Sequence, residues 1–188
     1  MLKVENARVY GIENACRVAR YPMASKIGEG IAEDGELLGR LARCKIGAGH
    51  DNALNGVIVQ FDLTASNKFW TELERYHFID YISSQSTMHC IAKMELREQC
   101  NEYVTEEMIG LIEGYKKDYL ENPTEENYLV LLYNIPSGFE LTAGMTTNYR
   151  QLKTMYEQRK NHRLPDWKNF CEWIRALPNS EWITGDRD

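Results

Sequence analysis

Three stretches of the chain alternate apolar and polar residues, which is the pattern of a strand with one buried face. In the third stretch apolar residues occupy every second position from Phe139 to Met145, with Glu140 and Thr142 between them. The predicted strands span residues 2–10, 57–63 and 139–146.

Other segments repeat their apolar residues at intervals of three and four, which is typical of helices with one buried side. Ser66 stands where it can cap one such helix, and Thr147 or Asn148 where either can cap another. After Pro178 we expect a loose tail. No repeat, low-complexity tract or linker interrupts the pattern, so we predict a single domain over residues 1–188. The predicted helices span residues 14–21, 33–46, 67–78, 106–120, 124–132, 148–159 and 165–176.

Composition excludes several classes of function. The net charge of −6 argues against a nucleic-acid-binding face, which would be basic. No apolar run approaches the ~18 residues of a membrane span, and the first residues do not resemble a signal peptide, so we expect a cytoplasmic protein. The five cysteines are scattered without paired spacing, so we expect reduced thiols and no metal site.

Two arginines on the predicted helix 148–159 bear on how that helix could be used. Arg150 and Arg159 are nine residues apart, and at about 100° per residue they lie on opposite sides of the helix. One small ligand could not easily reach both. Either one arginine is structural, or the helix runs between two sites, as it could in a symmetric oligomer.

His77 also has two interpretations. It shares one face of the predicted helix 67–78 with Trp70 and Leu73, at spacing i, i+3, i+7. A histidine on such an apolar stripe is more often a buried structural residue than a ligand. The motifs around it favour a ligand-binding role, because they occur in the order of a known family.

These motifs resemble, in order and spacing, those of the flavin-dependent thymidylate synthases, the thymidylate synthase complementing protein family. A glycine-histidine pair precedes a strand, a triplet centred on histidine ends the next helix, and a serine follows nine residues later. An asparagine and two arginines then lie on a later helix, with a proline upstream. The residues that carry the resemblance are Gly49, His50, Tyr76, His77, Phe78, Ser86, Pro136, Asn148, Tyr149, Arg150 and Arg159.

The resemblance implies an α+β fold with a curved antiparallel sheet flanked by helices, assembled as a homotetramer with sites between protomers. It also implies a flavin-dependent methyltransferase of the thymidylate synthase type. That reaction is the reductive methylation of deoxyuridine monophosphate, with FAD, reduced nicotinamide (NADPH) and methylene-tetrahydrofolate. By the same resemblance, the cofactor-binding residues are His50, His77, Asn148 and Arg150, and the catalytic residues are Ser86 and Arg159.

Four positions depart from the family pattern, because each holds an uncharged residue where the family has an arginine. Tyr76 and Phe78 replace the two triplet arginines, while Met88 and Leu132 replace two that recognise the nucleotide phosphate. Each lost charge-assisted hydrogen bond is worth roughly 1.5–3 kcal/mol. We therefore expect deoxyuridine monophosphate to bind weakly or not at all.

Three interpretations remain open. The chain is a flavin-dependent enzyme that modifies another pyrimidine nucleoside, nucleotide or related acceptor. Alternatively, it is a catalytically silent relative that keeps the fold for ligand binding, regulation or protein interaction. In the third, the match is a coincidence on an unrelated α+β protein, because resemblance alone does not fix function.

Overall fold

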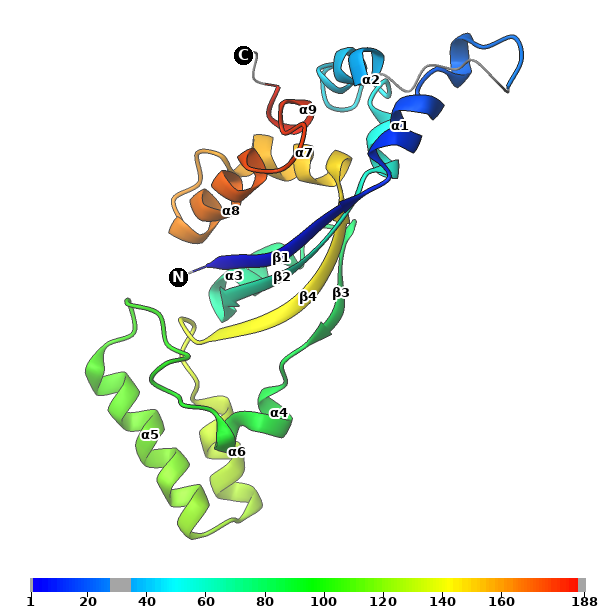
Figure 1. Cartoon of the computed structure of the whole chain (residues 1–188). Coiled ribbons are helices and arrows are strands. Elements are labelled where there is room, and N and C mark those ends of the chain that lie inside the picture. The colour runs from blue at the N-terminus through cyan, green and yellow to red at the C-terminus, as the bar shows by residue number, and fades with distance from the viewer. Residues whose placement is uncertain (1, 28–34, 186–188) are drawn as a thin grey trace.

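The computed structural model describes residues 2–27 and 35–185, and its centre is a four-stranded antiparallel sheet (Figure 1). The strands are β1 (Lys3–Tyr10), β2 (Ile58–Ser66), β3 (Ile79–Ser84) and β4 (Glu140–Asn148). They lie in the order β1-β2-β4-β3, and every neighbouring pair is antiparallel. The sheet is curved and open, and helices pack beside it, so the expected α+β fold is confirmed.

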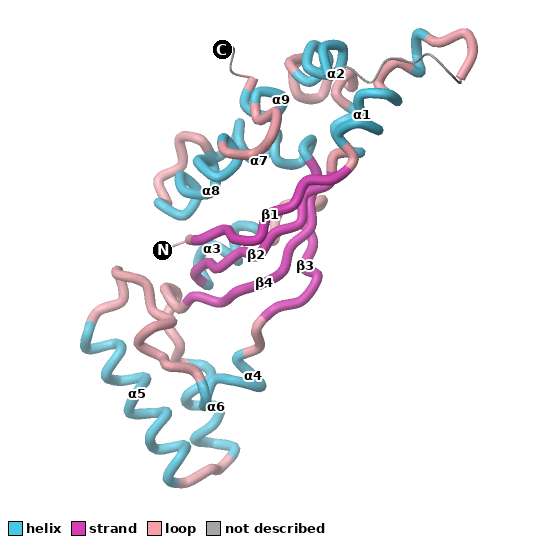
Figure 2. Tube along the Cα trace, viewed as in Figure 1, coloured by secondary structure: helices cyan, strands magenta, loops and turns pink. Residues whose placement is uncertain are grey.

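Helices gather beside the sheet and beyond one of its ends (Figure 2). In the described part of the chain, no helix is both long and apolar enough to cross a membrane. The α-helices are α1 (Ile12–Val18), α2 (Gly35–Ala42), α3 (Asn67–Leu73), α4 (Thr87–Cys90), α5 (Glu106–Glu121), α6 (Glu125–Tyr133), α7 (Tyr149–Arg159), α8 (Pro165–Arg175) and α9 (Glu181–Thr184). Short 3-10 helices are η1 (Tyr21–Met23), η2 (Asn52–Gly56) and η3 (Ile91–Lys93).

The main core lies on one face of β2 and β4, as their alternating pattern predicts. Phe61 and Leu63 are buried, whereas Gln60 on the opposite face is exposed. The Phe61 ring centroid lies 4.6 Å from that of Trp173 and 6.3 Å from that of Phe170, both on α8. The other face of these strands is more polar, and the helices α3, α7 and α8 pack into the main core.

A second apolar cluster lies away from the main core, in the lobe formed by α5 and α6 (Figure 2). The lobe joins the sheet where Cys100 pairs with Phe139 just before β4. The single domain expected from the sequence stays a prediction, and the structure adds that its interior has two apolar clusters. The buried residues of the second cluster are Ile91, Leu96, Ile112, Leu131 and Phe139.

The helix predicted over residues 67–78 is shorter in the structure. Helix α3 ends at Leu73, so His77 lies in the turn before β3 and is exposed. The apolar stripe that would have contained His77 therefore does not form. The chain has to become extended by Ile79, which pairs with Thr147 of β4. The sequence pattern missed β3 because only Ile79 is buried among its residues, and an exposed edge strand has no apolar alternation.

Two other segments also differ from the prediction. The tail after Pro178 contains α9, which buries Trp182 and Ile183. The helix predicted over residues 33–46 begins outside the described residues, and its described part, α2, ends at Ala42.

Candidate functional site

The start of α7 borders a cavity of about 390 Å³. Asn148 caps this helix, because its side-chain oxygen accepts a hydrogen bond of 2.8 Å from the backbone N–H of Gln151. The N–H of Tyr149 donates to the backbone carbonyl of Val57 at 3.0 Å. The side chain of Arg150, 37% exposed, adds a positive charge at this helix end, where it can attract an anion. The cavity is lined by Ile46, Gly47, Asp51, Asn55, Phe78, Asn148, Arg150, Gln151 and Thr154.

A buried carboxylate lies next to Arg150 in this cavity. Asp51 Oδ1 accepts a hydrogen bond from Arg150 Nε at 3.2 Å, and its Oδ2 accepts one from Lys153 Nζ at 2.7 Å. Burial favours the neutral form of Asp51, but the hydrogen bonds and charges of Lys153 and Arg150 outweigh it and lower the pKa of the carboxyl. Asp51 is therefore an anion at neutral pH.

Of the four residues predicted to bind a cofactor, Asn148 and Arg150 line the same cavity. His50 and His77 are exposed and do not line it, although each is the chain neighbour of a residue that does. Phe78 contributes an apolar wall at a position where the resembled family has an arginine. Within one chain, the structure brings two of the four residues to one cavity, and their role in binding a cofactor stays a prediction.

Arg159 lies at the other end of α7, where its side chain contacts α3, α8 and the turn between α3 and β3. Its Nε donates to Tyr76 Oη at 2.7 Å, and its Nη1 lies 3.5 Å from Glu72 Oε2. The guanidinium carbon also lies 4.6 Å from the centroid of the Trp167 ring. These contacts favour a structural role for one of the two opposed arginines, and the predicted role of Arg159 at a pyrimidine stays a prediction.

Glu72 is the centre of the group of side chains that contact Arg159. Its carboxylate accepts a hydrogen bond from Trp167 Nε1 at 2.9 Å and forms an ion pair of 3.0 Å with Lys68. Burial opposes its ionisation, but the hydrogen bonds from Trp167 and Lys68 more than compensate and lower its pKa. The cluster joins α3 to α7 through charged groups and both of them to α8 through the indole of Trp167. The side chains of Glu72 and Arg159 are only 12% and 15% exposed.

Ser86 follows the end of β3 that lies away from Asn148 and the start of α7. It is half-buried and immediately precedes α4, without capping that helix through its side chain. His77 and Ser86 lie at opposite ends of β3, and six residues of extended chain span roughly 20 Å. Met88, on α4, is 57% exposed, and its backbone carbonyl accepts a hydrogen bond from Tyr128.

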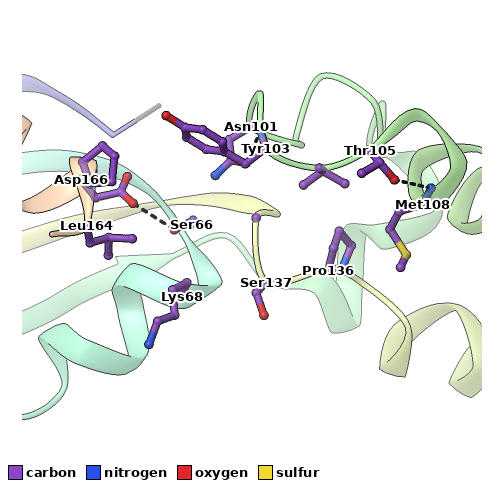
Figure 3. A pocket seen from close by; sticks show the side chains of 13 residues that line it. Ser66, Lys68, Asn101, Tyr103, Thr105, Met108, Pro136, Ser137, Leu164 and Asp166 are labelled. Carbon is purple, nitrogen blue, oxygen red and sulfur yellow. Dashed lines mark hydrogen bonds between the residues drawn. The ribbon is translucent and has the colours of Figure 1, made fainter.

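Another cavity, of about 590 Å³, lies between the sheet and the α5–α6 lobe (Figure 3). None of the six predicted site residues lines it. Ser66 and Asp166 lie together on one side, 3.5 Å apart between Ser66 Oγ and Asp166 Oδ2, and both are buried. Burial raises the pKa of Asp166. The sequence showed no sign of this cavity, since an acidic residue after Pro165 is ordinary at a helix start.

Sequence comparison identifies no relative, because no protein-family model and no curated protein match the chain. Comparison of structures does find similar proteins. One is thymidylate synthase X from Helicobacter pylori, in a crystal structure with FAD and dUMP. The TM-score is 0.73 at 17% sequence identity, over 98% of this chain and 97% of that one.

A second structure of the flavin-dependent thymidylate synthase from Helicobacter pylori, complexed with FAD and dUMP, gives the same result. Its TM-score is 0.72 at 17% identity, and 97% of each chain is covered. At this identity the likeness establishes the fold. The fold is that of thymidylate synthase X over nearly the whole chain, as the motif spacing had indicated.

Proposed function

We propose that the cavity at the start of α7 binds the phosphate-bearing part of a flavin nucleotide, by analogy with the FAD of the similar structures. The observation that carries this proposal is the placement of Arg150 and the capping residue Asn148 in one cavity, on a thymidylate synthase X fold. Arginine binds phosphate oxygens well because its guanidinium donates paired, charged hydrogen bonds.

The residues of one chain that line this cavity suit part of an FAD molecule. A cavity of about 390 Å³ lies within the usual range for small-molecule sites, roughly 300–1,000 Å³. Arg150 would hold a phosphate, while Ile46 and Phe78 offer apolar walls. A bound flavin would supply the electron and hydride chemistry. With both triplet arginines replaced, Arg150 is the cation that lines this cavity in the described chain.

The rest of such a site would come from neighbouring protomers of a homotetramer. Arg150 and Arg159 lie at opposite ends of α7, roughly 14 Å apart along the axis at 1.5 Å per residue. The edge strand β3 also carries exposed apolar side chains, with Tyr81 47% and Ile82 59% exposed. An edge strand with exposed apolar side chains is a surface that another chain can cover.

For the acceptor, we propose a pyrimidine nucleoside or a related, less phosphorylated molecule. NADPH and methylene-tetrahydrofolate are the proposed co-substrates, and the cytoplasm is the proposed location. The proposal of a less phosphorylated acceptor is supported by Met88 and Leu132, which stand where the resembled family has arginines that bind the nucleotide phosphate. A second candidate function, a silent relative that binds a ligand without catalysis, is favoured by the engagement of Arg159 with Glu72, Tyr76 and Trp167.

The absorption spectrum of the protein purified from cells, and again after incubation with FAD, tests the proposal. We expect flavin bands to remain with the protein through gel filtration. Incubation with deoxyuridine or deoxyuridine monophosphate, NADPH and methylene-tetrahydrofolate then separates the two candidates, because the enzyme forms a methylated product and the silent relative forms none. A protein that holds no flavin in either preparation would contradict both the enzymatic proposal and the proposed cofactor site.

A further inference from the structure

Asp51 and Lys153 form a buried pair behind Arg150, and the function proposed above gives neither of them a role. Asp51 is 2% exposed, and the Lys153 side chain is 9% exposed. Lys153 Nζ donates to Asp51 Oδ2 and to the backbone carbonyl of Cys44, both at 2.7 Å. Since a lysine is seldom buried without a partner, this arrangement is a specific feature of the chain.

The pair fixes the loop before β2 against α7. Arg150 and Lys153 are three residues apart, so they lie on neighbouring positions of one helix face. Asp51 receives both of them, and its backbone carbonyl accepts a hydrogen bond from Leu54 N–H at 3.0 Å. The carboxylate is therefore held from two sides. It binds Arg150 through Nε, which leaves the two terminal guanidinium nitrogens available for a ligand in the described structure.

The three charges also decide whether the cavity attracts an anion. Asp51 alone would cancel the charge of Arg150, because the two side chains form an ion pair inside the cavity. Lys153 supplies a second positive charge, so one positive charge remains for the group as a whole. Lys153 does not line this cavity but borders an adjacent one of about 350 Å³. It therefore acts on a ligand through Asp51 and not by contact.

We infer that Asp51 and Lys153 are positioning residues for an anion site: Asp51 orients Arg150, and Lys153 cancels the charge of Asp51 so that Arg150 presents a full charge. The ligand group that this geometry selects is a phosphate or diphosphate. The inference rests on the proposed function only in treating the cavity as an anion site. It does not require that the ligand be a flavin.

The experiment measures binding of inorganic pyrophosphate and ADP by titration calorimetry, with adenosine as the uncharged comparison. In Lys153→Met the charge of Asp51 is uncancelled, so we expect pyrophosphate to bind about tenfold or more weakly, with a shallower salt dependence. Lys117→Met is the matched control, because it makes the same change in net charge on the exposed face of α5, with a side chain 73% exposed. Its affinity should equal that of the unmodified protein.

Two double variants separate charge from orientation. Asp51→Asn/Lys153→Met keeps one net positive charge and an oxygen that can accept from Arg150 Nε, so it should regain most of the lost affinity. Asp51→Ala/Lys153→Met has the same charge but lacks the acceptor, so it should bind about tenfold more weakly than the first. Both remove the buried ion pair as a unit, which proteins tolerate better than the loss of one partner. They decide the orienting role of Asp51 even where Lys153→Met fails to fold, and pyrophosphate binding by the unmodified protein still tests the charge argument.

Equal affinities for the two double variants would overturn the positioning role. Unchanged binding in a folded Lys153→Met, or no pyrophosphate binding by the unmodified protein at millimolar concentration, would overturn the charge argument. A protein that binds pyrophosphate with the expected pattern but never binds FAD would contradict the proposed function and leave this inference standing.

Discussion

Replacing Arg159 by alanine tests whether this arginine is mainly a structural residue of the cluster around Glu72. Its charged hydrogen bond to Tyr76, 2.7 Å long, is worth roughly 1.5–3 kcal/mol. The stacking of its guanidinium on Trp167 adds about 1 kcal/mol. Glu72 keeps Lys68 and Trp167 as partners, so the variant does not leave a bare buried carboxylate. Because these contributions overlap, we expect Arg159→Ala to lower the free energy of unfolding by roughly 2–4 kcal/mol.

Urea unfolding followed by tryptophan fluorescence measures this change, and thermal unfolding should show a fall of roughly 5–15 °C in melting temperature. Arg163→Ala is the control, since Arg163 is exposed and carries the same charge. Its effect should stay within about 0.5 kcal/mol. If Arg159→Ala were as stable as the control but lost binding of a pyrimidine, the structural reasoning would be refuted and the ligand-binding role restored.

Three further predictions follow from individual contacts. Asp51 and Glu72 have lowered pKa values in the folded protein, so their contribution to stability should be complete above the ordinary pKa values of 3.8 and 4.5 and should be lost as the pH falls through the folded-state pKa values. Glu72→Gln should therefore reduce the loss of stability at acid pH, measured by urea unfolding, and an unchanged loss would contradict this. Burial raises the pKa of Cys171 to about 11. A thiol reagent at pH 8 should therefore label the exposed Cys90 quickly and Cys171 only after unfolding. Rapid labelling of Cys171 in a folded Cys90→Ser variant would disprove this. Gly138→Ala should lower the free energy of unfolding by roughly 1–3 kcal/mol, because the new Cβ would lie 2.5 Å from Val104 Cγ2. Gly110→Ala on α5 is the control, since its new Cβ meets nothing within 4 Å and alanine should stabilise the helix. Equal effects of the two variants on the melting temperature would rule out the steric argument.

Much of the fold was readable from the sequence because its signals are local. The alternation in β2 and β4 and the capping position of Asn148 each depend on residues within a few positions of one another. Strand β3 escaped detection because its pairing with β4 is made by backbone groups, while most of its side chains face solvent. The end of α3 is likewise set by that pairing and not by a breaker residue.

The candidate site was only partly predictable, for a related reason. Asn148 and Arg150 were assigned to the site through the resemblance to the flavin-dependent thymidylate synthases, whereas the local pattern alone predicted only a helix capped at Thr147 or Asn148. The contact between Lys153 and Asp51 joins residues 102 positions apart, and the contact between Arg159 and Glu72 joins residues 87 positions apart. A single sequence has no periodic signal for such pairs. Lys153 among the buried residues of α7 was the one local hint, because a lysine on a buried face needs a partner.

The most direct test of the account compares FAD with riboflavin, which has the same ring system without phosphate, by titration calorimetry on the unmodified protein and on Arg150→Ala. The account predicts that FAD binds the unmodified protein and that Arg150→Ala weakens this binding by about tenfold or more, since a charged hydrogen-bond pair to phosphate is lost. Riboflavin should bind both proteins equally. FAD binding that is equally tight in Arg150→Ala, or absent from the unmodified protein, would contradict the claim that the cavity at the start of α7 holds the phosphate of a flavin nucleotide.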